Sequence, residues 1–495
     1  MPLLASSALE KPVSGPALIV EPNSTLVVEE GWRVRRLADG ELMLDTLEMP
    51  TTASQTIEST LPARIEIFNN LFMHIAEQMG EANGQPDFFV ASRAHHADIG
   101  GTTPGSMPPF SKTIEEEGAL FELFQLVSEN DFLERELRDK LGADRYPARN
   151  PDQNVADLRA QLAANARGIA EIERAVQRHG LETVRAYMRH VQDNATACMK
   201  EAIDKLRPGS FRYEMDSGQA IAVRVDIDRA AQRVHVDFSG TSAQDPHNFN
   251  APRAVCIAAV LYVFRTLIDR PIPLNEGCLA PLEITIPRGS MLDPTPPAAV
   301  AAGNVETSQC IVDALYGALG MLAASRGTMN NLTFGNDRLQ YYETIAGGAG
   351  AGPGFAGCDT VQTHMTNSRL TDPEILEARF PVLLREFSIR RGSGGAGRHV
   401  GGNGSVRRIE FRAPLSGALL ANHRRIAPFG LEGGANGEVG SAYLTRANGS
   451  TERIGATASF SVEAGDVLTI HTPGGGGFGA AADQETPAAS RTRET

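Results

Sequence analysis

The chain has 495 residues, of which 42% are hydrophobic, and its formal net charge is -14 at neutral pH. This length predicts two or three packing units with a large apolar core. The acidic balance argues against a nucleic-acid or anionic-membrane binder, and no stretch approaches the ~20 apolar residues of a membrane span. The five cysteines are odd in number and never form a CxxC pair, which indicates reduced thiols in a cytoplasmic protein.

Short β-rich runs separated by turn residues occupy residues 15–48 and predict a small β element. These runs are Ala17 to Val20, Thr25 to Val28 and Trp32 to Arg35. From Ile65 to Met79 apolar residues instead recur every three or four positions, which predicts a helix with Gly80 as its C-cap glycine. The change of pattern places a domain boundary near residues 49–60.

Two helices and a β-hairpin are predicted next. Asn154 is the expected cap of a helix that ends before Gly180, and a second helix covers Leu181–Cys198. We expect these two helices to form an antiparallel helical hairpin with a solvated charged face. Strict alternation of apolar residues over Ile221–Ile227 and Val234–Phe238 predicts a β-hairpin.

A helix over residues 254–268, a strand over 282–286 and a helix over 305–324 follow, and the chain beyond Asn330 is glycine-rich and β-rich. Its glycines gather in three loops, at residues 347–354, 394–404 and 474–477. Such loops either let the backbone approach a ligand or another strand closely, or form tight turns between strands. Residues 481–495 are expected to form a disordered tail.

The stretch SRAHHADIGGTTPGSMPP, Ser92 to Pro109, contains the first candidate site. Its two adjacent histidines and nearby carboxylate are His95, His96 and Asp98. Imidazole and carboxylate groups are donors that divalent cations accept, so the three residues could bind a metal. They could equally provide a base with its orienting carboxylate, or cap a turn.

Two further groups of polar residues are candidate substrate contacts. The first comes from the strings GNVETSQ, MNNLTFGND and YYETIAGGAGAGP and comprises Asn304, Glu306, Asn330, Asn331, Tyr342 and Glu343. Such side chains suit a ligand with a lactam or carboxylate group, although they often only satisfy turn backbones. The second is Arg390 and Arg391, beside a glycine-rich nest that could hold an anion. No GxxxxGK[ST] loop indicates an ATP site within the chain.

Taken together, these motifs resemble the hydantoinase B half of the ATP-dependent 5-oxoprolinases. The match runs in order from about Ile65 to Gly479 and includes SRAHHADIGGTTPGSMPP, RNPDQNVADLRAQLAANARG, GNVETSQ, HMTNSRLTDPEILEARFPVLL and HTPGGGGFG. The resemblance implies an α+β fold with a helical section and a glycine-rich β region, over residues 60–480. Residues 1–50 resemble the C-terminal end of the hydantoinase A half.

The resemblance implies hydrolysis of a cyclic amide, 5-oxo-L-proline, to L-glutamate at the expense of ATP, in the glutathione cycle. In the family, ATP is handled by the hydantoinase A-like half, which would be the partner of this chain. The resemblance also implies that His95, His96 and Asp98 hold a divalent metal and act as catalytic residues. It further implies that the parent enzyme is a homo-oligomer.

The chain departs from the family pattern in ways that bear on activity. After Gly80 an RLDFSCALF-like strand, a PVHLG turn and a GG-(T/S)-HLPD motif are missing, which predicts an internal deletion and an incomplete metal site. Asn422 and His423 replace an acidic position of the family. We therefore expect the chain to be inactive without the A half. The alternatives are a B-type component of an N-methylhydantoinase and a non-catalytic, degenerate fragment.

Overall fold

The computed structural model describes residues 80–481, except 83, 84, 130 and 144, and short stretches between residues 3 and 46. The chain divides into two compact units, Met1–Leu61 and Pro62–Thr495. The helix predicted for Ile65 to Met79 and residues 482–495 of the predicted tail lie outside the described residues. No helix in the described ranges is both long enough and apolar enough to cross a bilayer.

The first unit contains two three-stranded sheets. One comprises β1 (Leu3–Ala5), β3 (Ala17–Val20) and β4 (Thr25–Val28), and the other β2 (Val13–Ser14), β5 (Trp32–Arg36) and β6 (Leu42–Thr46). Ile19, Val28 and Val34 are fully buried between them with Leu9 and Ala17. The predicted small β element is confirmed, because β3 and β4 pair antiparallel as adjacent runs should.

The second unit begins with short elements that lead into two long helices. These are β7 (Gly80–Ala82), β8 (Gln85–Phe88), a 3-10 turn (Ile114–Glu116), β9 (Val127–Ser128), β10 (Asp131–Phe132), α2 (Glu134–Gly142), α3 (Pro151–His179) and α4 (Leu181–Ile203). The cap of α3 is Asn150, whose side chain accepts the backbone N–H of Gln153, and not Asn154 as predicted. Pro151 explains the earlier start, since proline favours the first helical position.

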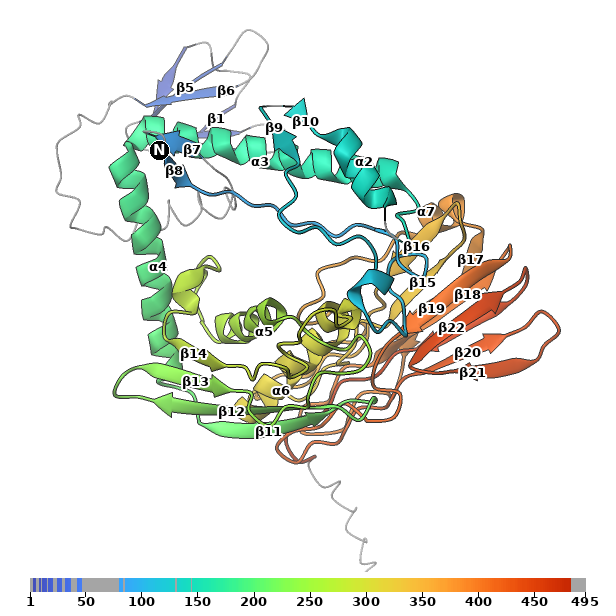
Figure 1. The fold of residues 1–495 in the computed structure, drawn as a ribbon. Coiled ribbons are helices and arrows are strands. Elements are labelled where there is room, and N and C mark those ends of the chain that lie inside the picture. Colours follow the sequence, from blue (N-terminus) through green and yellow to red (C-terminus); the bar gives the residue numbers. More distant parts are fainter. Residues whose placement is uncertain are drawn as a thin grey trace, which may run out of the picture. The chain divides into compact units, whose positions relative to one another are not determined.

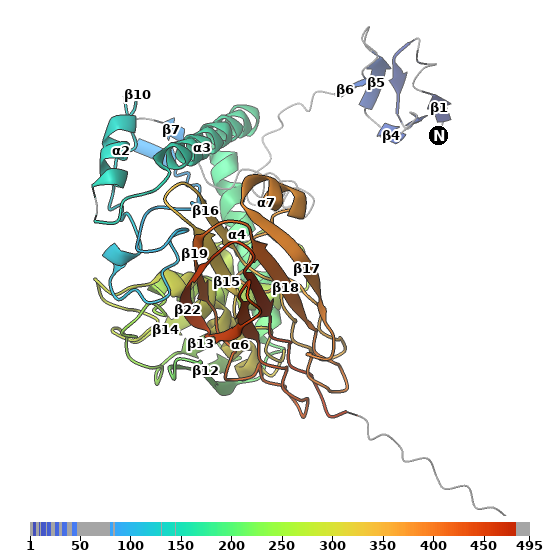
Figure 2. The ribbon, with the colours of Figure 1, turned by 90° about the vertical axis from the view of Figure 1, so that its right-hand side faces the viewer.

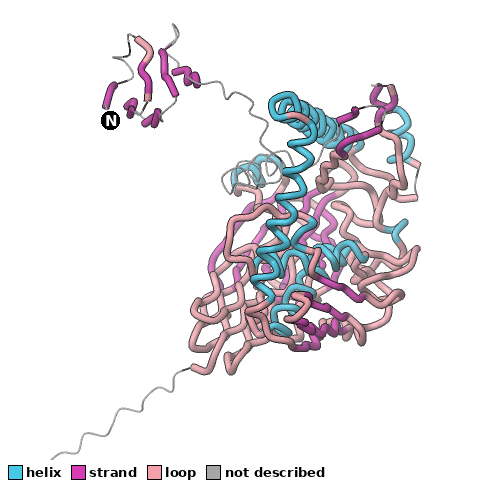
Figure 3. Tube along the Cα trace, turned by 90° about the vertical axis from the view of Figure 1, so that its left-hand side faces the viewer, coloured by secondary structure: helices cyan, strands magenta, loops and turns pink. Residues whose placement is uncertain are grey.

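The predicted antiparallel hairpin of these two helices is wrong. Helices α3 and α4 meet at a corner and then diverge, as Figures 1 and 3 show from two sides. A single residue, Gly180, joins them, and its φ of 81° turns the chain sharply without reversing it. Only the helix ends share a core, in which Ile172 and Val184 pack with Phe88.

A four-stranded sheet and two helices form the largest core of the second unit. The strands, in spatial order, are β11 (Gly209–Glu214), β12 (Ala220–Asp228), β13 (Arg233–Asp237) and β14 (Leu282–Thr285). Helices α5 (Arg253–Thr266) and α6 (Ser308–Leu319) contact each other, and α6 covers β11 and β12 (Figure 1). The predicted hairpin is confirmed, with Val225 opposite Val236 and Ile227 opposite Val234.

The helix predicted over residues 305–324 has a different start and end. It begins with a π-helical turn, Gly303–Thr307, continues as α6 and stops at Leu319. Gly320 ends it with a left-handed φ of 66°. A second 3-10 turn, Glu276–Cys278, packs on α4 and α5.

Two antiparallel sheets form the remainder of the unit, seen edge-on in Figure 2. One has the order β16 (Gln340–Glu343), β15 (Asn331–Gly335), β19 (Leu415–Leu420), β22 (Thr457–Val462). The other has the order β17 (Val382–Arg390), β18 (Gly404–Phe411), β23 (Val467–His471), β20 (Ser441–Thr445), β21 (Thr451–Ile454). Helix α7 (Pro373–Arg379) is capped by Asp372, whose side chain accepts the backbone N–H of Glu374. Phe334, Phe411 and Ile470 are buried in the core that the two sheets share.

The three glycine loops pack backbone against backbone. Gly402 N donates to Ala349 O at 2.8 Å, and Gly475 N donates to Gly402 O at 2.9 Å, which joins all three loops. A Cβ atom on Gly475 would lie 1.9 Å from Ala349 O, and one on Gly402 would lie 1.9 Å from Cys358 O. Close approach between segments therefore explains these glycines, and their role is to build the scaffold.

Candidate functional site

Asp98 organises the glycine-rich turn of the first candidate motif. Its carboxylate accepts the backbone N–H groups of Gly100 and Gly105, both at 3.0 Å, and that of Arg149 at 3.1 Å. The Arg149 guanidinium donates a further bond of 2.9 Å to Oδ2. Gly100 has a φ of 98°, which favours glycine. This geometry is that of a turn cap, one of the three roles the motif allows.

The two histidines lie beside this turn in different surroundings. His95 is exposed, whereas His96 Nδ1 lies 3.3 Å from Asp157 Oδ2 and 3.3 Å from Asn154 Nδ2. Within the described ranges no three His, Cys, Asp or Glu side chains are grouped as a metal site would require. As placed, the motif does not fit a divalent cation, because both Asp98 oxygens already accept N–H groups. The metal role of these three residues stays a prediction.

Several predicted substrate contacts converge in a buried polar group that we call the Glu306 cluster. Its members are Glu306, Arg326, Asn330, Asn331, Tyr342 and Arg424. Glu306 Oε1 accepts a bond of 2.7 Å from Asn331 Nδ2, and the Tyr342 hydroxyl donates to Asn331 Oδ1 at 2.8 Å. Asn331 thus holds the carboxyl and the phenol on opposite ends of one amide.

The local backbone explains why these residues meet. Glu306 lies on the π-helical turn, while Asn331 opens β15 and Tyr342 lies on the adjacent β16. Asn330 adopts a left-handed φ of 48°, and its Oδ1 accepts a bond of 2.7 Å from Arg424 Nη2. Single π-helical turns and left-handed non-glycine residues are uncommon and are frequent at functional sites.

Burial dominates the ionisation of the cluster. Glu306 is fully buried, which raises its pKa to about 8, although hydrogen bonds and the charges of Arg326 and Arg424 oppose this rise. Glu306 Oε2, Arg326 Nε and Arg424 Nε have no hydrogen-bond partner in the part of the chain that the structure describes. These three unpaired buried polar atoms are the groups of the cluster that remain available to water or a small polar ligand.

Four other predicted contacts lie outside this cluster. Asn304 is exposed, and its carbonyl accepts the Ser308 hydroxyl at 2.6 Å. The Glu343 carboxylate forms a buried, bidentate pair with Arg407, at 2.6 and 2.7 Å. Arg390 is engaged by Glu438 at 2.7 Å and by two backbone carbonyls, whereas Arg391 is exposed. The two arginines therefore do not converge on one anion.

Sequence patterns did not single out Arg326 or the Tyr213–His423 pair. Arg326 is fully buried and donates to Ile345 O at 2.6 Å. One charge within the apolar string GMLAASRGTM is the signal that could have found it. The Tyr213 hydroxyl lies 2.5 Å from His423 Nε2, a contact between residues 210 positions apart that no local pattern reveals.

The fold of this chain is shared with solved structures. The ATP-dependent caprolactamase from Pseudomonas jessenii has a similar fold, with a TM-score of 0.69 and 23% identity, over 78% of this chain and 71% of that one. Acetone carboxylase gives a TM-score of 0.67 and 17% identity over 78% and 60% of the two chains. The predicted α+β, hydantoinase B-like fold is confirmed.

Residues 81–481 match the hydantoinase B/oxoprolinase family, and the chain belongs to it. The 5-oxoprolinase 1 of Arabidopsis thaliana is 47% identical over 420 residues, which are 80% of this chain and 33% of that protein. The 5-oxoprolinase of Dictyostelium discoideum is 45% identical over 405 residues, 80% and 32% of the two chains. The chain spans about a third of the length of these relatives.

Proposed function

We propose that the chain is the B-type part of an ATP-dependent 5-oxoprolinase and that the complete enzyme converts 5-oxo-L-proline to L-glutamate. The observation that carries this proposal is the 47% and 45% identity to two proteins named 5-oxoprolinases. A putative D-/L-hydantoinase component from a Pseudomonas strain is 26% identical, which favours the oxoprolinase over the hydantoinase alternative. The proposal places the enzyme in the cytoplasm and in glutathione metabolism, as a homo-oligomer.

The chemistry explains why a partner is required. A lactam is a poor electrophile, so transfer of the γ-phosphoryl group of ATP to its oxygen activates the ring carbon. Water then adds to that carbon, the C–N bond breaks as the nitrogen takes a proton, and an acyl phosphate forms. A second water hydrolyses the acyl phosphate, giving glutamate, ADP and phosphate. ATP would be bound by the hydantoinase A-like partner.

Within this chain, the Glu306 cluster is the proposed place for the cyclic amide. A lactam offers one N–H donor and one carbonyl acceptor, and the cluster offers one unpaired carboxyl oxygen and two unpaired guanidinium N–H groups. With a pKa of about 8, Glu306 can hold or release a proton near neutral pH. His95, His96 and Asp98 remain proposed catalytic and metal-binding residues of the complete enzyme, in which Asp98 would have to give up bonds to the turn that it caps here.

The substrate is tested with the A-type partner present. The chain and partner are mixed with ATP and either 5-oxo-L-proline or hydantoin, and ring opening is followed by chromatography. We expect glutamate from 5-oxo-L-proline and at least tenfold slower opening of hydantoin. Preference for hydantoin would establish the hydantoinase alternative, and ATP hydrolysis without opening of either ring would favour the non-catalytic fragment.

A further inference from the structure

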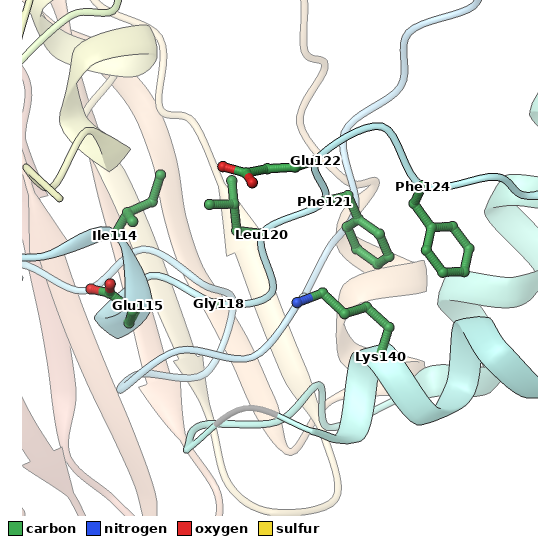
Figure 4. A pocket seen from close by; sticks show the side chains of 8 residues that line it. All are labelled: Ile114, Glu115, Gly118, Leu120, Phe121, Glu122, Phe124 and Lys140. Atoms are coloured by element: carbon green, nitrogen blue, oxygen red, sulfur yellow. The ribbon is translucent and has the colours of Figure 1, made fainter. Parts of the chain in front are cut away.

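A pocket of 340 Å³ lies between α2 and the segment that leads away from the first candidate motif. Figure 4 labels the residues that line it, which are Ile114, Glu115, Gly118, Leu120, Phe121, Glu122, Phe124 and Lys140. Its volume is at the lower end of the about 300–1,000 Å³ typical of small-molecule sites, so it suits a metabolite of amino-acid size. None of its residues belongs to the Glu306 cluster.

The pocket is lined by charges of both signs, Lys140 on one wall and Glu115 with Glu122 on the other. Lys140 reaches from α2 toward the opposite wall, which carries Glu115 and Glu122 (Figure 4). Among the described residues no ion pair joins Lys140 to either carboxylate, and neither carboxylate pairs with another cation. The Glu115 carboxylate does have a hydrogen bond with the Thr113 side chain, which lowers its pKa. A ligand with one carboxylate and one ammonium group would satisfy both walls.

The lining also defines the remainder of the ligand. Leu120 and Phe121 are 43% and 37% exposed, and Phe121 forms an edge-to-face pair with Phe124 at 5.5 Å. Two carboxylates against one ammonium leave the pocket with net negative charge, which disfavours a second acidic group on the ligand. An apolar side chain would cover the exposed rings instead.

Both walls are anchored to the rest of the unit by buried contacts. Buried Glu117 accepts the backbone N–H groups of Val300 and Ala301, both at 2.9 Å, and anchors the wall that carries Glu115. The other wall is held by Leu137 and Leu141 of α2, which share a core with Phe124. Pre-organised walls lower the entropy that binding must overcome.

We propose that this pocket is a binding site for a zwitterionic α-amino acid with an apolar side chain. The inference does not depend on the proposed reaction. Lys140 binds the carboxylate, Glu115 and Glu122 bind the ammonium group, and Leu120 with the two phenylalanines contacts the side chain.

The experiment titrates the full chain with L-leucine, L-leucinamide, N-acetyl-L-leucine and L-glutamate, by calorimetry or ligand-observed NMR. Leucinamide lacks the carboxylate and acetyl-leucine lacks the ammonium group. We expect L-leucine to bind more tightly than each of the other three, by up to about fivefold, because loss of one solvent-exposed ionic contact weakens binding only modestly.

Substitutions in each wall test which side chain binds the carboxylate and which binds the ammonium group of the ligand. Lys140→Gln should abolish the preference for leucine over leucinamide but keep the preference for leucine over acetyl-leucine. Glu122→Gln should weaken the preference for leucine over acetyl-leucine. Lys205→Gln, at an exposed lysine that does not line the pocket, is the control. Equal binding of all four ligands, no leucine binding at millimolar concentration, or unchanged preferences in folded Lys140→Gln would each overturn the proposal.

Discussion

Replacement of Glu306 by glutamine should change how the stability of the protein depends on pH. The side chain is fully buried, and burial raises its pKa from 4.5 to about 8. The difference corresponds to roughly 5 kcal/mol, an order-of-magnitude figure. Because the raised pKa favours the protonated form in the folded state, this stabilisation is complete below pH 4.5. It is lost as the pH rises through about 8.

Glutamine keeps the oxygen that accepts the Asn331 amide but cannot ionise. We therefore expect Glu306→Gln to gain stability relative to the unmodified chain between pH 5 and pH 8, by up to roughly 5 kcal/mol. Urea denaturation followed by circular dichroism at several pH values measures the difference. Glu201→Gln, at a carboxylate with 57% side-chain exposure, is the control and should show little pH dependence.

A pH-independent difference between Glu306→Gln and the unmodified chain would refute the reasoning. It would mean that the charges of Arg326 and Arg424 outweigh burial and keep Glu306 ionised from acid to neutral pH. Glu306 could then accept a hydrogen bond from a substrate but could not supply a proton to it.

Three further predictions concern the scaffold and the motif of the first candidate site. Asp98→Asn should destabilise the protein by about 2–4 kcal/mol in denaturant titrations, since it breaks the pair with Arg149, whereas exposed Asp139→Asn should change stability little. Gly402→Ala should destabilise the protein by about 1–3 kcal/mol or more in thermal melting, because the added Cβ would meet a backbone carbonyl. Gly142→Ala is the control and should not destabilise the protein, because the space around Gly142 is open. The chain should retain divalent metal weakly after gel filtration, and stoichiometric metal that is lost on replacing His95 would contradict this.

Elements with a strong local signal could be predicted from sequence. The alternation of apolar residues over Ile221–Ile227 and Val234–Phe238 predicted the hairpin of β12 and β13. Their observed register agrees with that pattern, because a one-residue slip would expose the buried face. The angle between two helices joined by a single residue could not be predicted from sequence. The antiparallel pairing predicted for α3 and α4 around Gly180 was therefore wrong. Periodicity identifies the apolar face of a helix but not what covers it.

The candidate site was predictable only in part for a related reason. Glu306, Asn331 and Tyr342 come from separate polar strings, and the structure brings these strings together on a π-helical turn and two paired strands. The carboxylate of Asp98 has its charge partner 51 positions away, and no short motif records that distance. Contacts of this range follow from the topology, which local patterns do not determine.

The most direct test of the proposed function measures L-glutamate formed from 5-oxo-L-proline and ATP by the purified chain, alone and co-expressed with a hydantoinase A-type partner. We expect no glutamate from the chain alone and ATP-dependent glutamate from the pair. Turnover by the chain alone would contradict the requirement for the partner. A pair that hydrolyses ATP without forming glutamate would contradict the proposed function of the chain.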